Sequence, residues 1–144
     1  KQLVPTRWLK PYHYLMAQGA AFVYRYPSNK MRVIGVTGTN GKSSTTQLIG
    51  QLLMQLGETV GWTTTDTFRI ADRVLVNDKK MTMLGRTQTH KMLREMVRHD
   101  CTYAIVETSS QGIDQYRHIG IHYDAAVFTN LITENIEEQG VFDN

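Results

Sequence analysis

The sequence is poor in cysteine: its 144 residues include one, Cys101. A single cysteine excludes an internal disulfide and any metal cluster held by several thiolates, and it fits a reducing, cytoplasmic setting. We expect Cys101 to be a small buried hydrophobic residue rather than a reactive thiol.

Long hydrophobic runs and a strong net charge are also missing. The apolar stretch at residues 12–26 is too short to cross a bilayer, which needs about 20 apolar residues. The net charge is only +3 and no basic stripe interleaved with aromatic residues is present, which argues against a nucleic-acid partner. A hydrophobic content of 41% is ordinary for a globular domain.

Residues 1–30 differ from the rest of the chain, because all three prolines lie there. The apolar stretch predicts an N-terminal helical segment, and residues 27–30, which begin with a proline, predict a short linker after it. Basic residues flank the apolar stretch at 12–26, so peripheral contact with an anionic membrane is one interpretation. We expect instead that this helix packs on the domain that follows.

From Met31 onward, strand and helix patterns alternate, which is typical of a parallel sheet covered by helices on both faces. The expected strands are 31–36, 58–64, 68–70, 74–76, 103–106 and 124–129, and the expected helices are 47–56 and 87–99. The pair 68–70 and 74–76 is expected to form a β-hairpin.

The expected helix at 47–56 carries apolar residues at helical spacing. These residues are Leu48, Ile49, Leu52, Leu53 and Leu56. Their spacing predicts that they form the face that packs on the sheet.

A glycine-bearing segment, residues 37–44, joins the first expected strand to this helix. Its residues are Thr37-Gly38-Thr39-Asn40-Gly41-Lys42-Ser43-Ser44. Backbone N–H groups of such a turn, and the positive end of the following helix, hold phosphates. We expect Lys42 to reach the β- and γ-phosphates and the Ser43 hydroxyl to ligate Mg²⁺. The general pattern G-x-x-x-x-G-K-[ST] is not met, because Val36 stands where its first glycine belongs.

Polar residues follow the other expected strands where each strand ends. They are Thr63-Thr64-Thr65-Asp66, Glu107-Thr108-Ser109-Ser110 and Thr129-Asn130. In open parallel sheets, ligands bind outside the carboxyl ends of the strands. A carboxylate at the position of Glu107 suits a phosphate-bound Mg²⁺, which takes few protein ligands.

The phosphate-binding loop and three linked motifs after it resemble the Mur ligases, which join an amino acid to a carboxylate using ATP. The loop is T-G-T-N-G-K-S at 37–43, and residues 107–117 are similar to the E-V-S-S-H-G-L…Q-x-R segment of the MurE type, which adds the third peptide residue. Residues 124–131 are similar to its D-x-A-V-F-T-N-L run, and 134–140 fall where it has D-H-L-D-x-H-G. The run at 63–66 also resembles cyanophycin synthetase.

The resemblance implies a three-layer α/β P-loop domain with a mostly parallel sheet flanked by helices, here residues 31–144 and incomplete at the C-terminus. It implies an ADP-forming ligase with ATP and Mg²⁺ as cofactors. The enzyme would join an amino acid to the carboxylate of a UDP-N-acetylmuramoyl-peptide-like substrate through an acyl phosphate, in peptidoglycan precursor synthesis. We expect a cytoplasmic monomer. The alternative interpretations are a cyanophycin-synthetase-like amide ligase, another class of P-loop enzyme, and a non-catalytic nucleotide-binding module.

The resemblance also implies roles for individual residues. Lys42 and Glu107 would be catalytic, with Ser43 and Glu107 holding the metal ion. The nucleotide-binding residues would be Gly38, Thr39, Asn40, Gly41, Lys42, Ser43, Ser44 and Asn130. The substrate-binding residues would be Thr64, Thr82, Ser109, Gln115 and Arg117. Three family histidines are replaced, by Gln111, Asn135 and Gln139. The replacement at Asn135 puts a second metal ion in doubt.

Overall fold

The structure is a computed structural model that describes residues 6–78 and 81–131. The helices of this part are α1 (Thr6–Val23), the 3₁₀ helix η1 (Pro27–Lys30), α2 (Lys42–Gln55), α3 (Arg86–Arg98) and α4 (Ser110–Asp114). The strands are β1 (Arg32–Thr37), β2 (Val60–Thr63), β3 (Thr67–Ile70), β4 (Arg73–Val76), β5 (Tyr103–Glu107) and β6 (Ala125–Phe128). All the expected elements are present. The largest shift is at α2, which begins at Lys42 rather than at residue 47.

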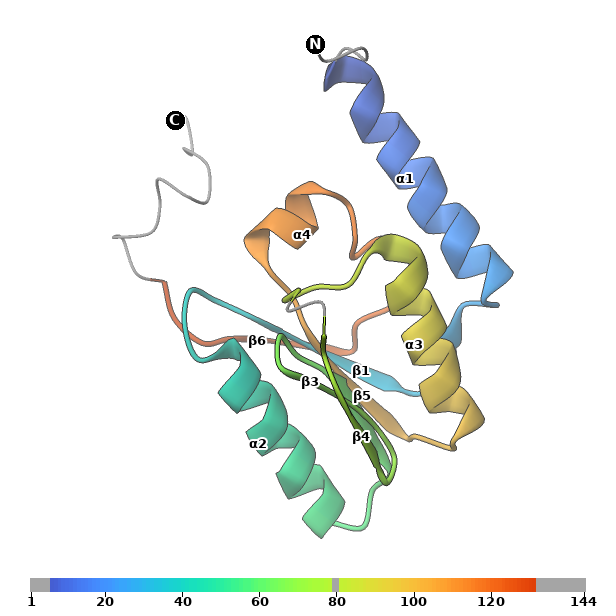
Figure 1. The fold of residues 1–144 in the computed structure, drawn as a ribbon. Helices are drawn as coiled ribbons and strands as arrows, with labels where there is room; N and C mark the ends of the chain where they lie inside the picture. The colour runs from blue at the N-terminus through green and yellow to red at the C-terminus, as the bar shows by residue number, and fades with distance from the viewer. Residues whose placement is uncertain (1–5, 79–80, 132–144) are drawn as a thin grey trace.

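One sheet forms the centre of the described part, with its six strands in the order β4-β3-β2-β5-β1-β6 (Figure 1). Strands β2, β5, β1 and β6 run parallel to one another. Strands β3 and β4 form the expected hairpin and add to β2 antiparallel. The predicted mostly parallel sheet is therefore confirmed. Its parallel strands bring their carboxyl ends to one edge.

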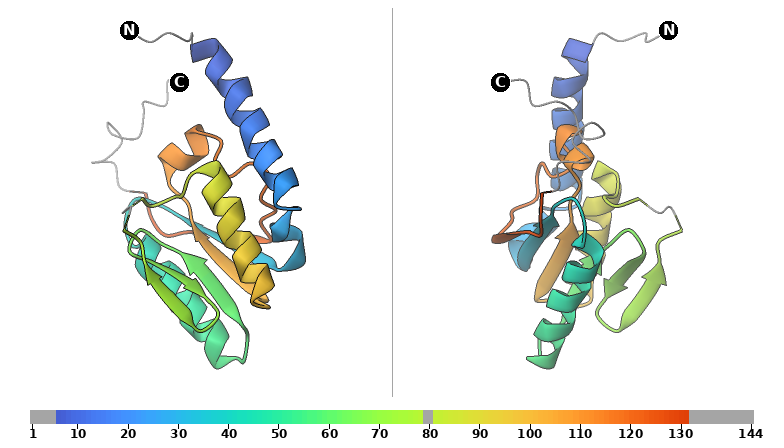
Figure 2. Two further views of the ribbon diagram at one scale, coloured as in Figure 1. Left: turned by 45° about the vertical axis from the view of Figure 1, so that its right-hand side comes forward. Right: turned by 90° about the vertical axis from the view of Figure 1, so that its left-hand side faces the viewer.

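Helices cover both faces of the sheet, which gives three layers (Figures 1 and 2). Strand β5 illustrates how the sequence specifies this, because successive side chains point to opposite faces. Ile105 belongs to the core beneath α2. Ala104 and Val106 belong to the second core, which includes Leu93 and Met96 of α3. The α/β class predicted from the sequence is confirmed.

The predicted sheet-facing side of α2 is wrong in part. The exposed members are Leu48, Leu52 and Leu56, whose accessible fractions are 56, 53 and 79%. Ile49 and Leu53 do pack on the core, but the buried residues of the helix are the small Thr46 and Gly50. A Cβ at Gly50 would lie 2.5 Å from Cε3 of Trp62. The indole of Trp62 on β2 therefore packs against Gly50, where α2 has no side chain, and the leucines remain exposed.

The N-terminal segment is in contact with the sheet domain. Helix α1 lies beside α3 (Figure 1), with Ala17 and Ala21 fully buried. The predicted linker forms η1, where Ser28 is buried and its Oγ accepts a hydrogen bond of 3.0 Å from the backbone N–H of His122. A domain boundary at residue 30 stays a prediction. Within the described residues, no helix has the length and apolar character to span a membrane.

Two titratable side chains lie in the core. Cys101 is buried, as predicted, and burial raises the pKa of its thiol. His90 of α3 has no accessible surface, and its Nε2 lies 3.2 Å from the carbonyl oxygen of Ile119. Burial lowers the pKa of His90, because the charged imidazolium would lose its hydration.

Candidate active site

The predicted phosphate-binding loop connects β1 to α2 at the carboxyl edge of the sheet. Gly41 precedes the first helical residue with φ 80° and offers no side-chain cap, so the N–H groups of the first turn of α2 are open to a ligand. The Nζ of Lys42 donates hydrogen bonds to the carbonyls of Gly38 and Thr39, at 2.9 and 2.8 Å. The ammonium therefore lies over the loop.

The end of β6 holds the other side of this loop. The carbonyl of Asn130 accepts a hydrogen bond from the N–H of Thr39 at 3.0 Å. Its side-chain Oδ1 accepts one from the N–H of Asn40 at 2.9 Å. The hydroxyl of Thr129 donates to the carbonyl of Asn40 at 2.7 Å. Gly38 has φ 137°, and a Cβ there would lie 2.1 Å from Thr129 Oγ1. Gly38 therefore lies where the loop backbone approaches the end of β6 too closely for a side chain.

The carboxylate of Glu107 lies next to the loop, at the end of β5. Only 2% of the residue is exposed. Its Oε2 accepts hydrogen bonds from the hydroxyl of Ser43 at 2.8 Å and from the backbone N–H of Thr65 at 2.9 Å. Residues from three separate segments therefore meet at this carboxylate, as the strand order predicts.

Glu107 and Ser43 fit a divalent cation. Within the described residues, the carboxylate forms no ion pair with a basic side chain, and an uncompensated buried charge is costly. A carboxylate and a hydroxyl beside a phosphate-binding loop supply the oxygen ligands that Mg²⁺ prefers, and Mg²⁺ completes its shell with phosphate and water.

The threonines that follow β2 differ in what they contact. Thr64 is fully buried, and its hydroxyl donates to the carbonyl of Thr67 within a tight turn. Thr65 instead points to the site, where its Oγ1 lies 3.3 Å from Glu107 Oε1 and 3.1 Å from Thr82 Oγ1. Thr82 is therefore linked to the carboxylate through Thr65, whereas the hydroxyl of Thr64 is used within the turn.

The remaining predicted substrate residues surround α4. Ser109 caps this helix by accepting a hydrogen bond from the N–H of Gly112 at 3.1 Å. The Oε1 of Gln115 accepts from Nε and Nη2 of Arg117, at 3.0 and 2.6 Å. Arg117 also donates to the carbonyl of Met83, which follows Thr82. These bonds connect the segment after β5 with the segment before α3.

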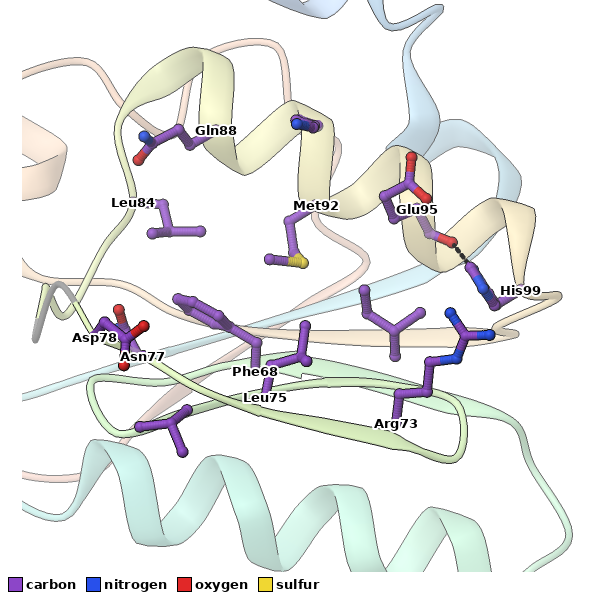
Figure 3. A pocket seen from close by; sticks show the side chains of 13 residues that line it. Phe68, Arg73, Leu75, Asn77, Asp78, Leu84, Gln88, Met92, Glu95 and His99 are labelled. Carbon is purple, nitrogen blue, oxygen red and sulfur yellow. Dashed lines mark hydrogen bonds between the residues drawn. The ribbon is translucent and has the colours of Figure 1, made fainter.

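A cavity of about 500 Å³ lies elsewhere, between the β3–β4 hairpin and α3 (Figure 3). Phe68 and Leu75 rise from the hairpin, and Met92 and Gln88 face them from the helix. None of the residues predicted to bind nucleotide, metal or substrate lines this cavity. The candidate active site is therefore the open rim at the strand ends.

Comparison with known proteins identifies the family. The family model described as "Mur ligase middle domain" matches residues 36–144. The chain belongs to the Mur ligase family. A UDP-N-acetylmuramyl-tripeptide synthetase from Treponema pallidum is 36% identical over 130 residues, which are 89% of this chain and 24% of the relative. A UDP-N-acetylmuramoyl-L-alanyl-D-glutamate–2,6-diaminopimelate ligase from Aquifex aeolicus is 34% identical over 77% of this chain and 23% of its own length.

A solved structure of a UDP-N-acetylmuramoyl-L-alanyl-D-glutamate–2,6-diaminopimelate ligase supports the same family assignment. It superposes with a TM-score of 0.70 at 28% identity, covering 81% of this chain and 24% of that one. The chain therefore spans about a quarter of the length of these Mur ligases. The segment 31–144 is shorter than the 130-residue match to the Treponema pallidum relative. That match therefore includes part of residues 1–30 as well.

Sequence reasoning gives no individual role to three residues of this Mur ligase rim. Thr65 and Thr129 are expected there only as part of the polar strand ends, and the structure shows that both contact the loop or its carboxylate. Arg86, the first residue of α3, belongs to none of the motifs. A basic residue in the first turn of a helix opposes the helix dipole, and that signal could have marked it. The replacements at Asn135 and Gln139 lie outside the described residues.

Proposed function

We propose that the whole protein is an ATP-dependent, ADP-forming ligase that joins an amino acid to the carboxylate of a UDP-N-acetylmuramoyl-peptide-like acceptor. The observation that carries the proposal is the buried Glu107 carboxylate hydrogen-bonded to the Ser43 hydroxyl at 2.8 Å, beside a phosphate-binding loop. The names of the similar Mur ligases support the acceptor class and a place in peptidoglycan precursor synthesis.

The loop residues would bind the nucleotide. The open N–H groups at the start of α2 and the Lys42 ammonium would face the phosphate oxygens, in exchange for the carbonyls that Lys42 contacts in the structure. Asn130 would act indirectly, because its hydrogen bonds hold the backbone of residues 39–40 in place. Ser43 and Glu107 would hold Mg²⁺, which neutralises charge on the transferring phosphoryl group.

The chemistry needs no protein nucleophile. An oxygen of the acceptor carboxylate attacks the γ-phosphorus, and the bond to the bridging oxygen breaks, which gives an acyl phosphate and ADP. The amine then attacks the acyl carbon, phosphate leaves with the bonding electrons, and the nitrogen loses a proton to the departing phosphate or to water as the amide forms. The protein's contribution is to position the acceptor and to stabilise charge with Lys42.

Thr82, Ser109, Gln115 and Arg117 are the proposed acceptor contacts. Their support is placement: Gln115 bonds Arg117, Arg117 bonds the carbonyl of Met83 next to Thr82, and Thr82 contacts Thr65 beside Glu107, while Ser109 caps α4 in the segment after β5. Thr64 has weaker support, because its hydroxyl is committed to the turn with Thr67.

The test has two parts. Calorimetric titration of Mg-ATP into this chain, and into Lys42→Ala, should give binding that the substitution abolishes. Phosphate release by the full-length protein should require ATP, the acceptor and an amino acid together, and Glu107→Gln should lower its rate by at least about a hundredfold at saturating Mg²⁺. Turnover that does not depend on the amino acid would indicate another P-loop enzyme. Binding without any turnover would indicate a non-catalytic module.

A further inference from the structure

Two arginines, Arg86 and Arg117, lie at the rim and converge on one residue, Gln115. Arg86 donates from Nε and Nη2 to the backbone carbonyl of Gln115, at 3.1 and 2.6 Å. Arg117 donates from Nε and Nη2 to the side-chain Oε1 of the same residue, at 3.0 and 2.6 Å. Both arginines are half-buried. The two guanidinium groups are therefore held at opposite ends of a single glutamine.

No carboxylate balances this pair of charges in the described part of the chain. The ion pair found there joins Arg98 to Glu95 at the other end of α3. Burial and the neighbouring charge of Arg86 lower the pKa of Arg117. The charge of Arg86 also contributes, after burial, to the lowered pKa of His13. The first turn of α3 contains no acidic residue either, so the positive helix end adds to the uncompensated field.

The hydrogen bonds of the pair leave donors available. An arginine has five N–H groups, and Nη1 of Arg86 makes no hydrogen bond to a described residue. Nη1 of Arg86 is not among the buried atoms that lack a partner in the described residues, so it is accessible to solvent and to a ligand. A half-buried like-charged pair with spare donors is the arrangement that receives an oxyanion.

The pair is connected to the proposed catalytic carboxylate. Arg117 donates to the carbonyl of Met83, and the adjacent Thr82 lies 3.1 Å from Thr65 Oγ1. Thr65 in turn donates its backbone N–H to Glu107 at 2.9 Å. An anionic group on the arginines would thus lie at the same rim as the Glu107 carboxylate.

We propose that Arg86, together with Arg117, binds an oxyanion of the acceptor substrate, either a carboxylate of its peptide or a phosphate of its nucleotide. Arg86 is then a substrate-binding residue in addition to those implied by the family motifs. The inference rests on the proposed function, and it predicts that loss of Arg86 weakens acceptor binding while ATP binding is retained.

The kinetic test compares Arg86→Gln with Arg98→Gln in the full-length protein. The acceptor is UDP-N-acetylmuramoyl-L-alanyl-D-glutamate, the compound named for similar ligases. Arg86→Gln should raise the KM for the acceptor about tenfold or more and leave the KM for ATP unchanged. Arg86→Lys should recover part of the loss, since it keeps the charge without the fork. Arg98→Gln, on an exposed side chain of the same helix, should change neither constant.

Chemical labelling of the wild-type protein gives a second measurement, which does not depend on whether a variant folds. Phenylglyoxal modifies accessible guanidinium groups, and mass spectrometry locates them. The acceptor should protect Arg86 and Arg117 but not Arg98, and ATP should protect neither of the pair. Protection by UDP-N-acetylglucosamine, which carries the diphosphate but no carboxylate, would identify a phosphate as the bound group, and protection by L-alanyl-D-glutamate, which carries no phosphate, would identify a carboxylate.

The outcomes separate this inference from the function on which it rests. A wild type that shows no saturable dependence on the acceptor refutes the proposed function, and the inference falls with it. A wild type that ligates, with an unchanged acceptor KM in Arg86→Gln or with no protection of Arg86, overturns only the inference. An Arg86→Gln protein that melts earlier and loses ATP affinity equally would show a structural brace and also overturn it.

Discussion

Replacing Gly38 with alanine should disrupt the nucleotide site far more than replacing Gly41, although both glycines have positive φ. At Gly41, with φ 80°, a new Cβ meets no atom within 4 Å. The cost there is the left-handed backbone alone, about 1–2 kcal/mol. At Gly38, with φ 137°, the new Cβ would lie 2.1 Å from Thr129 Oγ1 and 2.9 Å from the carbonyl oxygen of Asn130.

The expected cost at Gly38 combines two effects. A backbone conformation that non-glycine residues rarely adopt costs about 1–3 kcal/mol, and overpacking against a backbone that must move costs about 1–3 kcal/mol more. Because a change of 1 kcal/mol shifts the melting temperature of a chain of this size by roughly 2–4 °C, Gly38→Ala should melt several degrees below Gly41→Ala. It should also lose Mg-ATP binding, since the displaced end of β6 holds residues 39–40.

The assay is thermal unfolding of both variants by circular dichroism, followed by calorimetric titration with Mg-ATP. Equal melting temperatures for the two variants, with ATP binding retained in Gly38→Ala, would refute the argument. That result would mean that the loop and the end of β6 do not approach as closely as the structure indicates.

Two further predictions concern the core. Gly50→Ala should destabilise the fold by about 1–3 kcal/mol despite the better helix propensity of alanine, because its Cβ would lie 2.5 Å from Trp62; a lower urea midpoint checks this, and a higher one would contradict it. His90 has a lowered pKa in the folded state, so the unfolded chain binds its proton first and stability should fall as the pH drops below the unfolded value of about 6.5. His90→Gln should reduce that acid sensitivity, measured as the difference between urea midpoints at pH 7.5 and pH 5.5, and an unchanged difference would show that other groups dominate.

Much of the fold could be predicted because its signals are local. The apolar runs that became β1, β2 and β5 are separated by helical patterns, and that alternation predicts a parallel sheet. The loop around Lys42 and the carboxylate of Glu107 could be found for the same reason. Strand ends of a parallel sheet meet at one edge whatever the details of packing.

The parts that could not be predicted depend on packing between distant segments. Apolar spacing on α2 does not distinguish Leu52 from Leu53, and the choice was decided by Trp62, which requires Gly50 opposite it. The choice between Thr64 and Thr65 is a difference of one residue in register, which reverses the direction of a side chain at a strand end. The helix-dipole signal could mark Arg86, but its partner depends on where the segment after α4 returns, and no local pattern encodes that contact.

The contacts between the phosphate-binding loop and the end of β6 also have a consequence for how the protein folds. The hydrogen bonds that connect residue 40 with residues 129 and 130 join positions 89 and 90 residues apart. Contacts of such long sequence separation require closure of a large loop, and they form slowly. The local hairpin and helices can form before β6 has been added to β1. Nucleotide affinity should therefore be the last property that the chain acquires, and it would report whether the final strand has joined the sheet.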